Sequence, residues 1–362
     1  MAAMGRQAKK AIIAMSGGVD SSVGAAALVE AGYDVTGVFL CLGSDSDEGS
    51  SGCCSPQDAA DARRVAQVLG IGLYVLNVAE AFAPIIEHFL AEYAAGRTPN
   101  PCVHCNTHIK FGRLLRYADS LGVRHVATGH YARIVQAGGL PAIARSLDRR
   151  KDQSYALFGI DRASLGRILL PIGEMGGKAE VRRVALRLGL DVHDKPDSQE
   201  VCFVPDDDYV AFLRRRAPGA LQPGEIVDAD GRVLGRHDGY AQFTIGQRRG
   251  LRVAAGVPLY VTHIDPVTAR VTVGTKEQTM TRCLRAERAN WHRPTEQGFR
   301  AVVQIRYSHA GAPARVRLTG TDSFDVDFDE DVSAVTPGQA AVVYDGDLLL
   351  GGGWIAPRNE GA

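Results

Sequence analysis

The sequence predicts an α/β protein: a doubly wound parallel sheet at the N-terminus, a small central domain and a C-terminal antiparallel β-barrel. Over roughly the first two hundred residues, short apolar runs alternate with helical patterns, which is typical of parallel strands joined by helices. From about residue 206, short strands are separated by Gly and Pro, and some alternate in polarity, as residues 324–328 do, which favours antiparallel sheet. Residues 226–235, with Asp-Gly in the turn, predict a hairpin. We therefore expect three domains, at 1–205, 206–280 and 281–362.

The elements of the first domain follow from local patterns. Apolar runs predict strands, and apolar residues three or four apart predict helices. Ser55 and Pro56 mark one helix start, as N-cap and first helical residue. Ligands of parallel sheets bind beyond the carboxyl ends of strands, so we expect the first strand–helix turn, Leu40 and residues 128–130 to converge. The predicted strands are 11–15, 35–40, 73–77 and 123–128, and the helices are 19–29, 56–69, 82–93 and 111–121.

The turn after the first strand carries the strongest motif, Ser-Gly-Gly-Val-Asp-Ser-Ser at residues 16–22. Its glycines let backbone N–H groups approach phosphate oxygens, and the helix N-terminus favours negative charge. We interpret Asp20 as a Mg²⁺ ligand that bridges to phosphate. The turn lacks the lysine of a Walker A loop and the third glycine of a dinucleotide fingerprint. It resembles the PP-loop of the ATP pyrophosphatase superfamily, which implies the adenine nucleotide alpha hydrolase-like fold and cleavage of ATP between its α and β phosphates.

The composition excludes some classes of protein. The chain has 362 residues, 45% of them apolar, and a formal net charge of zero. Because no run of 18 apolar residues occurs, we expect no membrane span. The basic residues 1–10 lead into a strand and do not predict a signal peptide. We therefore expect a cytoplasmic protein in which any nucleic acid is held by local basic patches.

Seven cysteines are present, at positions 41, 53, 54, 102, 105, 202 and 283. Cys102 and Cys105 form a Cys-x-x-Cys in a proline-rich stretch that we expect to be a loop before the helix at 111. As a dithiol the pair could form a disulfide or carry sulfur. Together with Cys202, three thiolates could instead hold a [4Fe–4S] cluster with one iron open. Cys41 and Cys283 are interpreted as buried small hydrophobes.

Three basic stretches would suit an RNA backbone. They are residues 145–151, Arg248-Arg249 and Arg306-Tyr307. Arginine pairs with phosphate, and tyrosine can stack on a base. A charge run such as residues 148–155 is more commonly a solvated loop, so each stretch alone is weak evidence for RNA binding.

A series of motifs in one order covers nearly the whole chain. By this series the sequence resembles the bacterial tRNA-specific 2-thiouridylases, which thiolate the wobble uridine of certain tRNAs. The motifs are the loop at 16–22, Arg97-Thr98-Pro99-Asn100-Pro101, Cys105-Asn106, Lys110-Phe111, Ala127-Thr128-Gly129-His130-Tyr131, Lys151-Asp152-Gln153-Ser154-Tyr155, Cys202-Phe203, Gly246-Gln247-Arg248 and Thr336-Pro337-Gly338-Gln339.

The resemblance implies roles for residues at matching positions. It implies that ATP is bound by Ala14, Met15, Ser16, Gly17, Gly18, Val19, Asp20, Ser21 and Leu40, with Gly129 beside the adenosine. It implies that the target base is lined by Asn100, Pro101 and Cys102. It implies that tRNA is contacted by His130, Lys151, Asp152, Gln153, Arg306, Tyr307 and Gln339.

The resemblance also implies a reaction. ATP and Mg²⁺ would adenylate uracil O2, and the target base would leave the anticodon stack. Cys202 would carry a persulfide loaded by a sulfur-relay protein or cysteine desulfurase. Cys105 would be the nucleophile that releases the sulfur, leaving a Cys105–Cys202 disulfide. Thiolate character is needed at both sulfurs.

The chain departs from the family's sequence pattern at two places. Many family members carry Asp where this chain has Cys102, which favours the iron–sulfur interpretation. The stretch after Leu40 lacks the family's aromatic residue and carries Cys53-Cys54.

There are two alternatives to this function. One alternative is another PP-loop enzyme that ligates or amidates a small carboxylate. The other is a non-catalytic RNA-binding or iron–sulfur protein with a degenerate loop, although the loop motif is intact.

Overall fold

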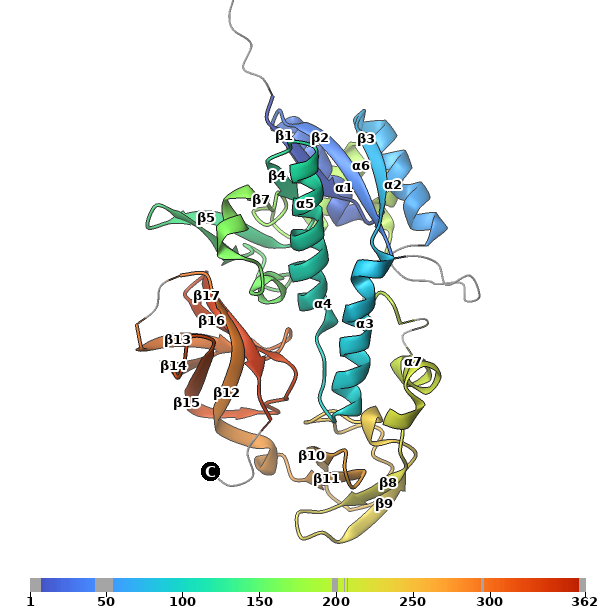
Figure 1. Ribbon diagram of the computed structural model, residues 1–362, viewed down its shortest axis with the longest axis vertical. Helices are drawn as coiled ribbons and strands as arrows, with labels where there is room; N and C mark the ends of the chain where they lie inside the picture. The colour runs from blue at the N-terminus through green and yellow to red at the C-terminus, as the bar shows by residue number, and fades with distance from the viewer. Residues whose placement is uncertain are drawn as a thin grey trace, which may run out of the picture. The chain divides into compact units, whose positions relative to one another are not determined.

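A computed structural model describes residues 8–42, 55–196, 201–204, 206, 208–293 and 296–357. The chain divides into two compact units. Unit 1 comprises Met1–Ala83, Cys102–Asp206 and Asp347–Leu349, and unit 2 comprises Pro84–Pro101, Asp207–Gly346 and Leu350–Ala362. Figure 1 labels helices and strands of both units. No helix within the described ranges combines the length and the apolar character needed to cross a membrane.

Unit 1 is built on a parallel sheet of five strands, which confirms the predicted fold class. The order is β3-β2-β1-β4-β7, and neighbouring strands pair in parallel. Ile12 of β1 lies between Thr36 and Val126 of the adjacent strands. The bounds are β1 (Lys10–Ala14), β2 (Asp34–Cys41), β3 (Gly72–Asn77), β4 (His125–Ala127) and β7 (Ile168–Leu169).

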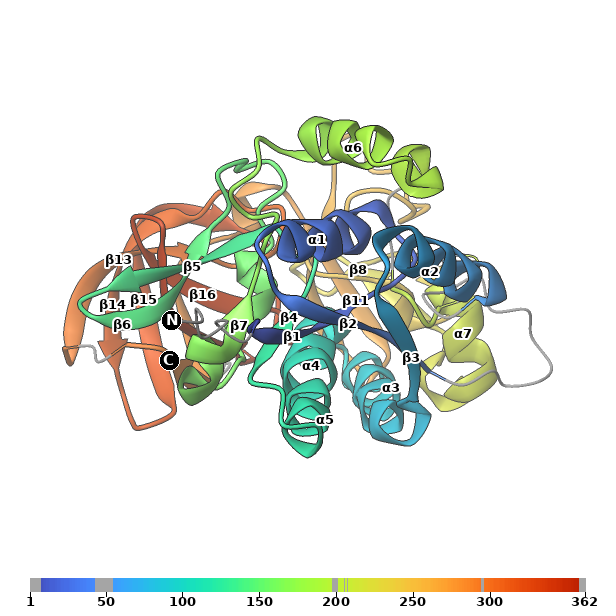
Figure 2. The ribbon, with the colours of Figure 1, turned by 90° about the horizontal axis from the view of Figure 1, so that it is seen from above.

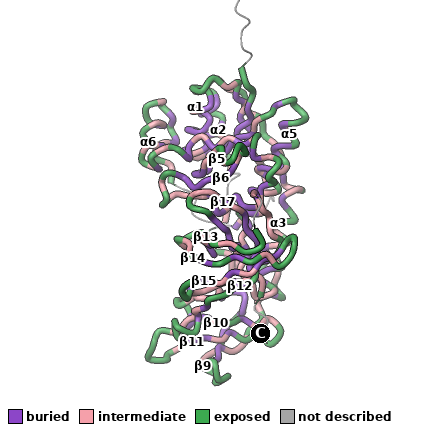
Figure 3. Tube along the Cα trace, turned by 90° about the vertical axis from the view of Figure 1, so that its left-hand side faces the viewer, coloured by how far each residue is buried: buried purple, intermediate pink, exposed green. Residues whose placement is uncertain are grey.

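Helices cover both faces of this sheet. Figure 2 shows α1, α2 and α6 on one side and α4 and α5 on the other. Ile13, Met15 and Val23 are fully buried between β1 and α1, a region coloured purple in Figure 3. The bounds are α1 (Val19–Glu30), α2 (Pro56–Leu69), α4 (Pro101–His104), η1 (Cys105–Arg113), α5 (Leu114–Ser120) and α6 (Lys178–Arg187). A further helix, α3 (Ala79–Ala94), begins in unit 1 and continues in unit 2.

The helix that carries the Cys-x-x-Cys pair begins earlier than the sequence pattern predicts. We expected a loop up to residue 110, but helical structure starts at Pro101. Proline is favoured at the first helical position because its φ is already helical and its missing N–H is not needed there. Residues Cys105–Arg113 then form a π-helix before α5 resumes α-helical geometry.

A β-hairpin interrupts the strand–helix alternation of unit 1. β5 (Ala132–Ala137) and β6 (Leu140–Arg145) pair in antiparallel fashion directly after β4. Leu348, in the short Asp347–Leu349 segment of unit 1, pairs with Ala144. Short 3₁₀ helices complete the unit, at η2 (Ser154–Leu157), η3 (Arg162–Arg167) and η4 (Asp191–Asp194).

Unit 2 contains a four-stranded sheet and a closed barrel. The sheet has the order β10-β11-β8-β9 and includes the predicted hairpin, in which Ile226 lies opposite Gly235. The parallel β8–β11 pair joins two antiparallel pairs. The elements of unit 2 between residues 209 and 279 are α7 (Tyr209–Arg216), η6 (Pro218–Ala220), β8 (Gly224–Val227), β9 (Val233–His237), η7 (Tyr240–Gln242), β10 (Tyr260–Asp265), β11 (Arg270–Gly274) and η8 (Glu277–Thr279).

The barrel has six antiparallel strands in the order β12-β15-β14-β13-β16-β17, and β12 also pairs with β17. The alternation that predicted β15 is confirmed: Phe324, Val326 and Phe328 are buried around Asp325 and Asp327, which are half-buried. The strands are β12 (Met280–Trp291), β13 (Gly298–Gln304), β14 (Ala312–Leu318), β15 (Ser323–Ser333), β16 (Ala340–Asp345) and β17 (Leu348–Ile355).

Candidate active site

The loop between β1 and α1 is held by the first turn of the helix that follows it. The backbone N–H of Ser16 donates to the hydroxyl of Ser21 at 3.2 Å. The hydroxyls of Ser21 and Ser22 both donate to the carbonyl of Gly18, at 3.1 and 2.8 Å. Gly18 is the N-cap of α1 and has no side chain to satisfy the first-turn N–H groups. Those groups are therefore offered to an anion at this helix end.

Two glycines allow neighbouring backbone to approach this loop closely. Gly17 has a φ of +73°, and a Cβ there would lie 2.3 Å from the carbonyl oxygen of Asp58. Gly129, after β4, packs on the first turn of α1, since a Cβ there would lie 2.6 Å from the nitrogen of Ser21. Leu40 lies near the end of β2, one strand from the loop. The structure therefore brings Gly129 to the predicted nucleotide loop.

Asp20, the predicted Mg²⁺ ligand, is engaged by two side chains. The ammonium nitrogen of Lys178 lies 2.9 and 2.8 Å from the two carboxylate oxygens, and the hydroxyl of Tyr131 donates to one of them at 2.7 Å. Lys178 is the first residue of α6, 158 residues away in the sequence. No motif of the sequence around Lys178 predicts this contact.

A second lysine, Lys195, connects the loop to α2 by hydrogen bonds. The ammonium of Lys195 donates to the carbonyl of Gly17 at 3.0 Å and to the carboxylates of Asp58 and Asp61 at 2.6 and 2.5 Å. Burial alone would raise the pKa of Asp61, but hydrogen bonds from Lys195 and Gln57 outweigh it and lower that pKa. Burial would lower the pKa of Lys195, yet its bonds to the two carboxylates raise it. Lys195 and Asp61 are therefore charged at neutral pH, and the hydrogen bonds of Lys195 fix Gly17 against α2.

The candidate catalytic cysteines both lie in unit 1, and neither is in a disulfide. Cys105 is the first residue of the π-helix and is half-buried, whereas Cys102 is exposed. Cys202 is also half-buried, and the ring of the adjacent Phe203 packs edge-on against Phe82 with centroids 5.6 Å apart. Short π-helical stretches occur frequently at functional sites.

The described structure does not bring the three cysteines together as metal ligands. Within the described ranges, which include Cys102, Cys105 and Cys202, no three Cys, His, Asp or Glu side chains are placed to hold a metal ion. Cys53 and Cys54 lie outside the described residues. The structure thus gives the three-cysteine cluster no support.

The predicted tRNA contacts of unit 1 are largely engaged within the protein. The side chain of Asp152 is 5% exposed and accepts hydrogen bonds from Arg145, Ser146 and Ser154. Gln153 exchanges hydrogen bonds with the backbone of Tyr131. Lys151 is half-buried. These residues order the 146–154 turn, and their contact with tRNA stays a prediction.

His130 is buried, with a ring nitrogen 2.6 Å from the hydroxyl oxygen of Thr128. Burial, with the charge of Lys110, holds the pKa of His130 well below its ordinary value of 6.5. The imidazole is therefore neutral at neutral pH and cannot attract phosphate by charge. Its predicted tRNA contact is untested.

In unit 2, Gln339 holds the segment that precedes the Cys-x-x-Cys helix. Its amide nitrogen donates to the carbonyls of Thr98 and Pro99, each at 3.1 Å. The N–H of Thr98 donates to the carbonyl of Pro337 at 3.0 Å. Gly338 has a φ of +88°, and a Cβ there would lie 2.8 Å from the carbonyl oxygen of Thr98. We call this arrangement, residues 337–339 around Thr98 and Pro99, the clamp. The next residues in the chain are Asn100 and Pro101.

A cavity of about 550 Å³ lies beside the clamp in unit 2. Two cationic side chains, Lys276 and Arg306, line it together with hydroxyl groups and Gln339. Arg306 also donates to the carbonyl of Ser333 at 3.1 Å. Tyr307, the neighbour of Arg306, is 51% exposed. Cations and hydroxyl donors around one cavity suit the phosphates and sugars of a nucleic acid.

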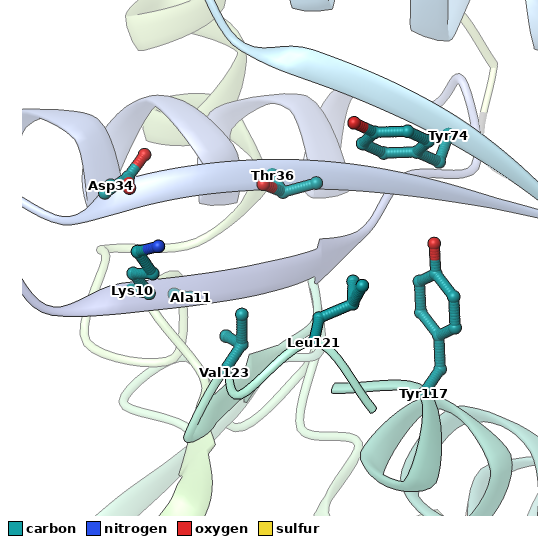
Figure 4. A pocket seen from close by; sticks show the side chains of 8 residues that line it. All are labelled: Lys10, Ala11, Asp34, Thr36, Tyr74, Tyr117, Leu121 and Val123. Carbon is teal, nitrogen blue, oxygen red and sulfur yellow. The ribbon is translucent and has the colours of Figure 1, made fainter. Parts of the chain in front are cut away.

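A second pocket, of about 250 Å³, lies in unit 1, at the edge of the sheet opposite to the nucleotide loop. Figure 4 shows Lys10 and Asp34 at one end of this pocket and Tyr74 and Tyr117 at the other. Lys10 and Asp34 are the first residues of β1 and β2. Nucleotides bind at carboxyl ends of parallel strands, so this pocket is not part of the candidate site.

Comparison with known proteins matches the chain almost from end to end. Three family models match in sequence: a tRNA methyl transferase HUP domain over residues 9–206, a tRNA methyl transferase PRC-barrel domain over 210–275, and an aminomethyltransferase β-barrel domain over 281–355. A tRNA-specific 2-thiouridylase MnmA of Rhodopirellula baltica is 46% identical over 96% of each chain. That of Carboxydothermus hydrogenoformans is 48% identical over 97% of this chain and 98% of its own.

Proposed function

Because the chain belongs to the tRNA-specific 2-thiouridylase family, we propose that it is an ATP-dependent sulfurtransferase that thiolates position 2 of the wobble uridine in tRNA. The observation that carries this proposal is the identity of 46% and 48% with relatives along 96% and 97% of the chain. An alternative restricted to the N-terminal domain would leave the central sheet and the barrel without a role. The division into domains at 205/206 and 280/281 and the cytoplasmic location stay predictions.

The loop at residues 16–22 serves the first half of the reaction. The first-turn N–H groups of α1 and the hydroxyls of Ser16 and Ser21 bind phosphate oxygens of ATP. Bound Mg²⁺, for which Asp20 is the proposed ligand, supplies charge neutralisation and Lewis acidity at the phosphates. Leu40 and Gly129 lie beside the nucleoside.

Activation makes uracil O2 a leaving group. O2 bonds to the α-phosphorus, the electron pair of the breaking Pα–O bond departs on pyrophosphate, and the N3–H proton goes to solvent. The base must be extruded from the anticodon stack to meet ATP. Asn100, Pro101 and Cys102 are the residues proposed to line it.

The two half-buried cysteines serve the second half. The terminal sulfur of a Cys202 persulfide, loaded by a sulfur-relay protein or cysteine desulfurase, attacks C2, and AMP leaves with O2. The Cys105 thiolate then attacks the sulfur of Cys202. The bond to the transferred sulfur breaks, and its electron pair stays with the thiolated base. The resulting Cys105–Cys202 disulfide takes two electrons from a thiol reductant. No step of this route uses an iron–sulfur cluster.

Contacts with tRNA draw on both units. In unit 2, Arg306 in the cavity and the exposed Tyr307 are proposed to pair with phosphate and stack on a base. In unit 1, Lys151 and its neighbours Asp152 and Gln153, with His130, are the proposed contacts. Gln339 has both amide hydrogens directed at backbone carbonyls, so its proposed tRNA contact is through its oxygen.

The test is a thiolation assay on protein purified without oxygen, with iron and labile sulfide measured on the same sample. With ATP, tRNA and a persulfidated cysteine desulfurase, iron-free protein should form 2-thiouridine with release of AMP and pyrophosphate. ATP–pyrophosphate exchange that needs no RNA, without thiolated product, would point instead to a ligase for small molecules. Activity that tracks about four irons per chain would overturn the persulfide route.

A further inference from the structure

The nucleotide loop has an acidic residue where phosphate-binding loops often have a basic one. Asp20 is the second residue of α1, and the motif at residues 16–22 contains no lysine or arginine. An unpaired carboxylate at this position would repel the phosphates that the helix N-terminus attracts. Another part of the chain must therefore supply positive charge if the loop is to hold a triphosphate.

That charge comes from α6. The ammonium of Lys178 lies within 2.9 Å of both carboxylate oxygens of Asp20, and its side chain is only 14% exposed. Helix α6 packs on α1 through Val181 and Ala185, which are fully buried in the core of unit 1. Since both helices are anchored in one core, the position of the ammonium beside the loop is fixed by the fold.

A purely structural ion pair accounts poorly for this arrangement. Asp20 is 32% exposed, and ion pairs with that access to water contribute little to stability. The hydroxyl of Tyr131 already donates to the same carboxylate. An ammonium has three N–H donors in a flexible geometry, so Lys178 can keep one bond to Asp20 and direct others to an incoming anion.

We propose that Lys178 is a catalytic residue that binds the β and γ phosphates of ATP and supplies the lysine that the loop lacks. Asp20 holds the ammonium in place before the nucleotide arrives. During adenylation the electron pair of the breaking Pα–O bond leaves on pyrophosphate. The charge of Lys178 stabilises that developing negative charge in the transition state. This assignment rests on the proposed use of ATP at this loop.

The test compares ATP with AMP, which lacks the β and γ phosphates. Binding of each nucleotide is measured without tRNA on the wild type, Lys178→Ala, Lys178→Arg and Arg183→Ala. Arg183 is exposed on the same helix, so its replacement is a matched loss of one positive charge. In Lys178→Ala, ATP affinity should fall about 10- to 100-fold, the worth of a charged hydrogen bond, with AMP affinity unchanged. Lys178→Arg should recover part of it, and Arg183→Ala should match the wild type.

The rate of pyrophosphate release in a single turnover with tRNA is the second measurement. Lys178→Ala should lower it by about 100-fold or more, as loss of one transition-state donor does, while the Kd for tRNA stays unchanged. Equal losses of ATP and AMP affinity would overturn the proposal and leave Lys178 as a support of the loop. Unchanged ATP affinity would overturn it too. If the ATP-specific loss is found but no 2-thiouridine forms in the wild type, the proposed function fails while the role of Lys178 stands.

Discussion

The nucleotide loop of unit 1 and the clamp of unit 2 both place a glycine at positive φ against another backbone segment, yet they differ in what they leave open. The loop is closed by hydrogen bonds among Ser16, Gly18 and Ser21, residues at most five apart, and it leaves the first-turn N–H groups of α1 to a ligand. The clamp joins segments about 240 residues apart and directs the amide hydrogens of Gln339 at backbone carbonyls. The comparison indicates that the loop is built to bind and the clamp to position.

The largest effect is expected where chemistry depends on one sulfur. Cys202→Ala should give no thiolated tRNA, because no other residue is proposed to carry the persulfide, while ATP binding stays intact. Mass spectrometry of tRNA digests measures the product, and equilibrium binding measures the nucleotide. Cys283→Ala is the matched control, since Cys283 is exposed on the barrel. The burial that the sequence predicted for Cys283 was wrong. Thiolation at the wild-type rate in Cys202→Ala would remove Cys202 from the mechanism.

Asp20→Ala tests whether the nucleotide loop is built to bind ATP. Thiolation should fall on the order of 100- to 1,000-fold, as when one transition-state contact is lost, because the Mg²⁺ ligand and the anchor of Lys178 disappear together. The affinity for tRNA should not change. Single-turnover thiolation and filter binding provide the two measurements, with Asp34→Ala, at the opposite end of the sheet, as control. Unchanged thiolation would remove Asp20 from the site.

Gly338→Ala and Gln339→Ala test whether the clamp positions the segment that contains Thr98 and Pro99. Each should lower kcat for thiolation by about tenfold, the worth of one or two hydrogen bonds, with little change in the Kd for tRNA. The physical reason is that both free the 98–99 backbone from which Asn100 and Pro101 continue. Because Gly338 has no side chain to offer RNA, matching losses in the two variants would favour positioning. A weakened tRNA affinity in Gln339→Ala alone would favour a direct tRNA contact.

The smallest effect is expected for Lys195, which connects the nucleotide loop to α2. Lys195→Met should lower the free energy of unfolding by about 1–3 kcal/mol, measured by urea denaturation against Lys195→Arg. Because the pKa of Asp61 is lowered from 3.8, its contribution is present above pH 3.8 and is lost as the pH falls through the lowered pKa. Because the pKa of Lys195 is raised from 10.5, its contribution is complete below pH 10.5 and is lost only as the pH rises through the raised pKa. The difference between the variants should therefore be flat from about pH 5 to 9, and a difference that grows on acidification would contradict this account.

Local patterns predicted the parts of the molecule that local physics decides. The strand, turn and helix around residues 16–22 and the β8–β9 hairpin are confirmed, because glycine placement and apolar periodicity act within a few residues. The β5–β6 hairpin was missed, since it interrupts an otherwise regular alternation. The start of the helix at Pro101 was also missed, because two prolines and a glycine in that stretch are equally typical of a loop.

Long-range partners could not be predicted in this way. Lys178 and Lys195 lie 158 and 178 residues from the loop residues that they contact, and neither stands in a distinctive pattern. Gln339 was expected at tRNA through the family resemblance, whereas its amide nitrogen bonds to residues 98 and 99. Which partner such a side chain selects depends on packing between distant segments, and a single sequence does not encode that in any local spacing.

The π-helix at Cys105–Arg113 has a consequence for how this site can change by insertion and deletion. A π-helical stretch accommodates additional residues within an otherwise α-helical rod. Because its hydrogen bonds join residues five apart rather than four apart, a π-helical turn holds more residues than an α-helical turn. Removing one residue between Cys105 and Arg113 would therefore bring the stretch toward α-helical winding with little change in the direction of the Cys105 thiol relative to α5. The same deletion within α5, which is α-helical, would turn every residue before it by about 100°, one residue's share of a 3.6-residue turn, and would redirect the thiol.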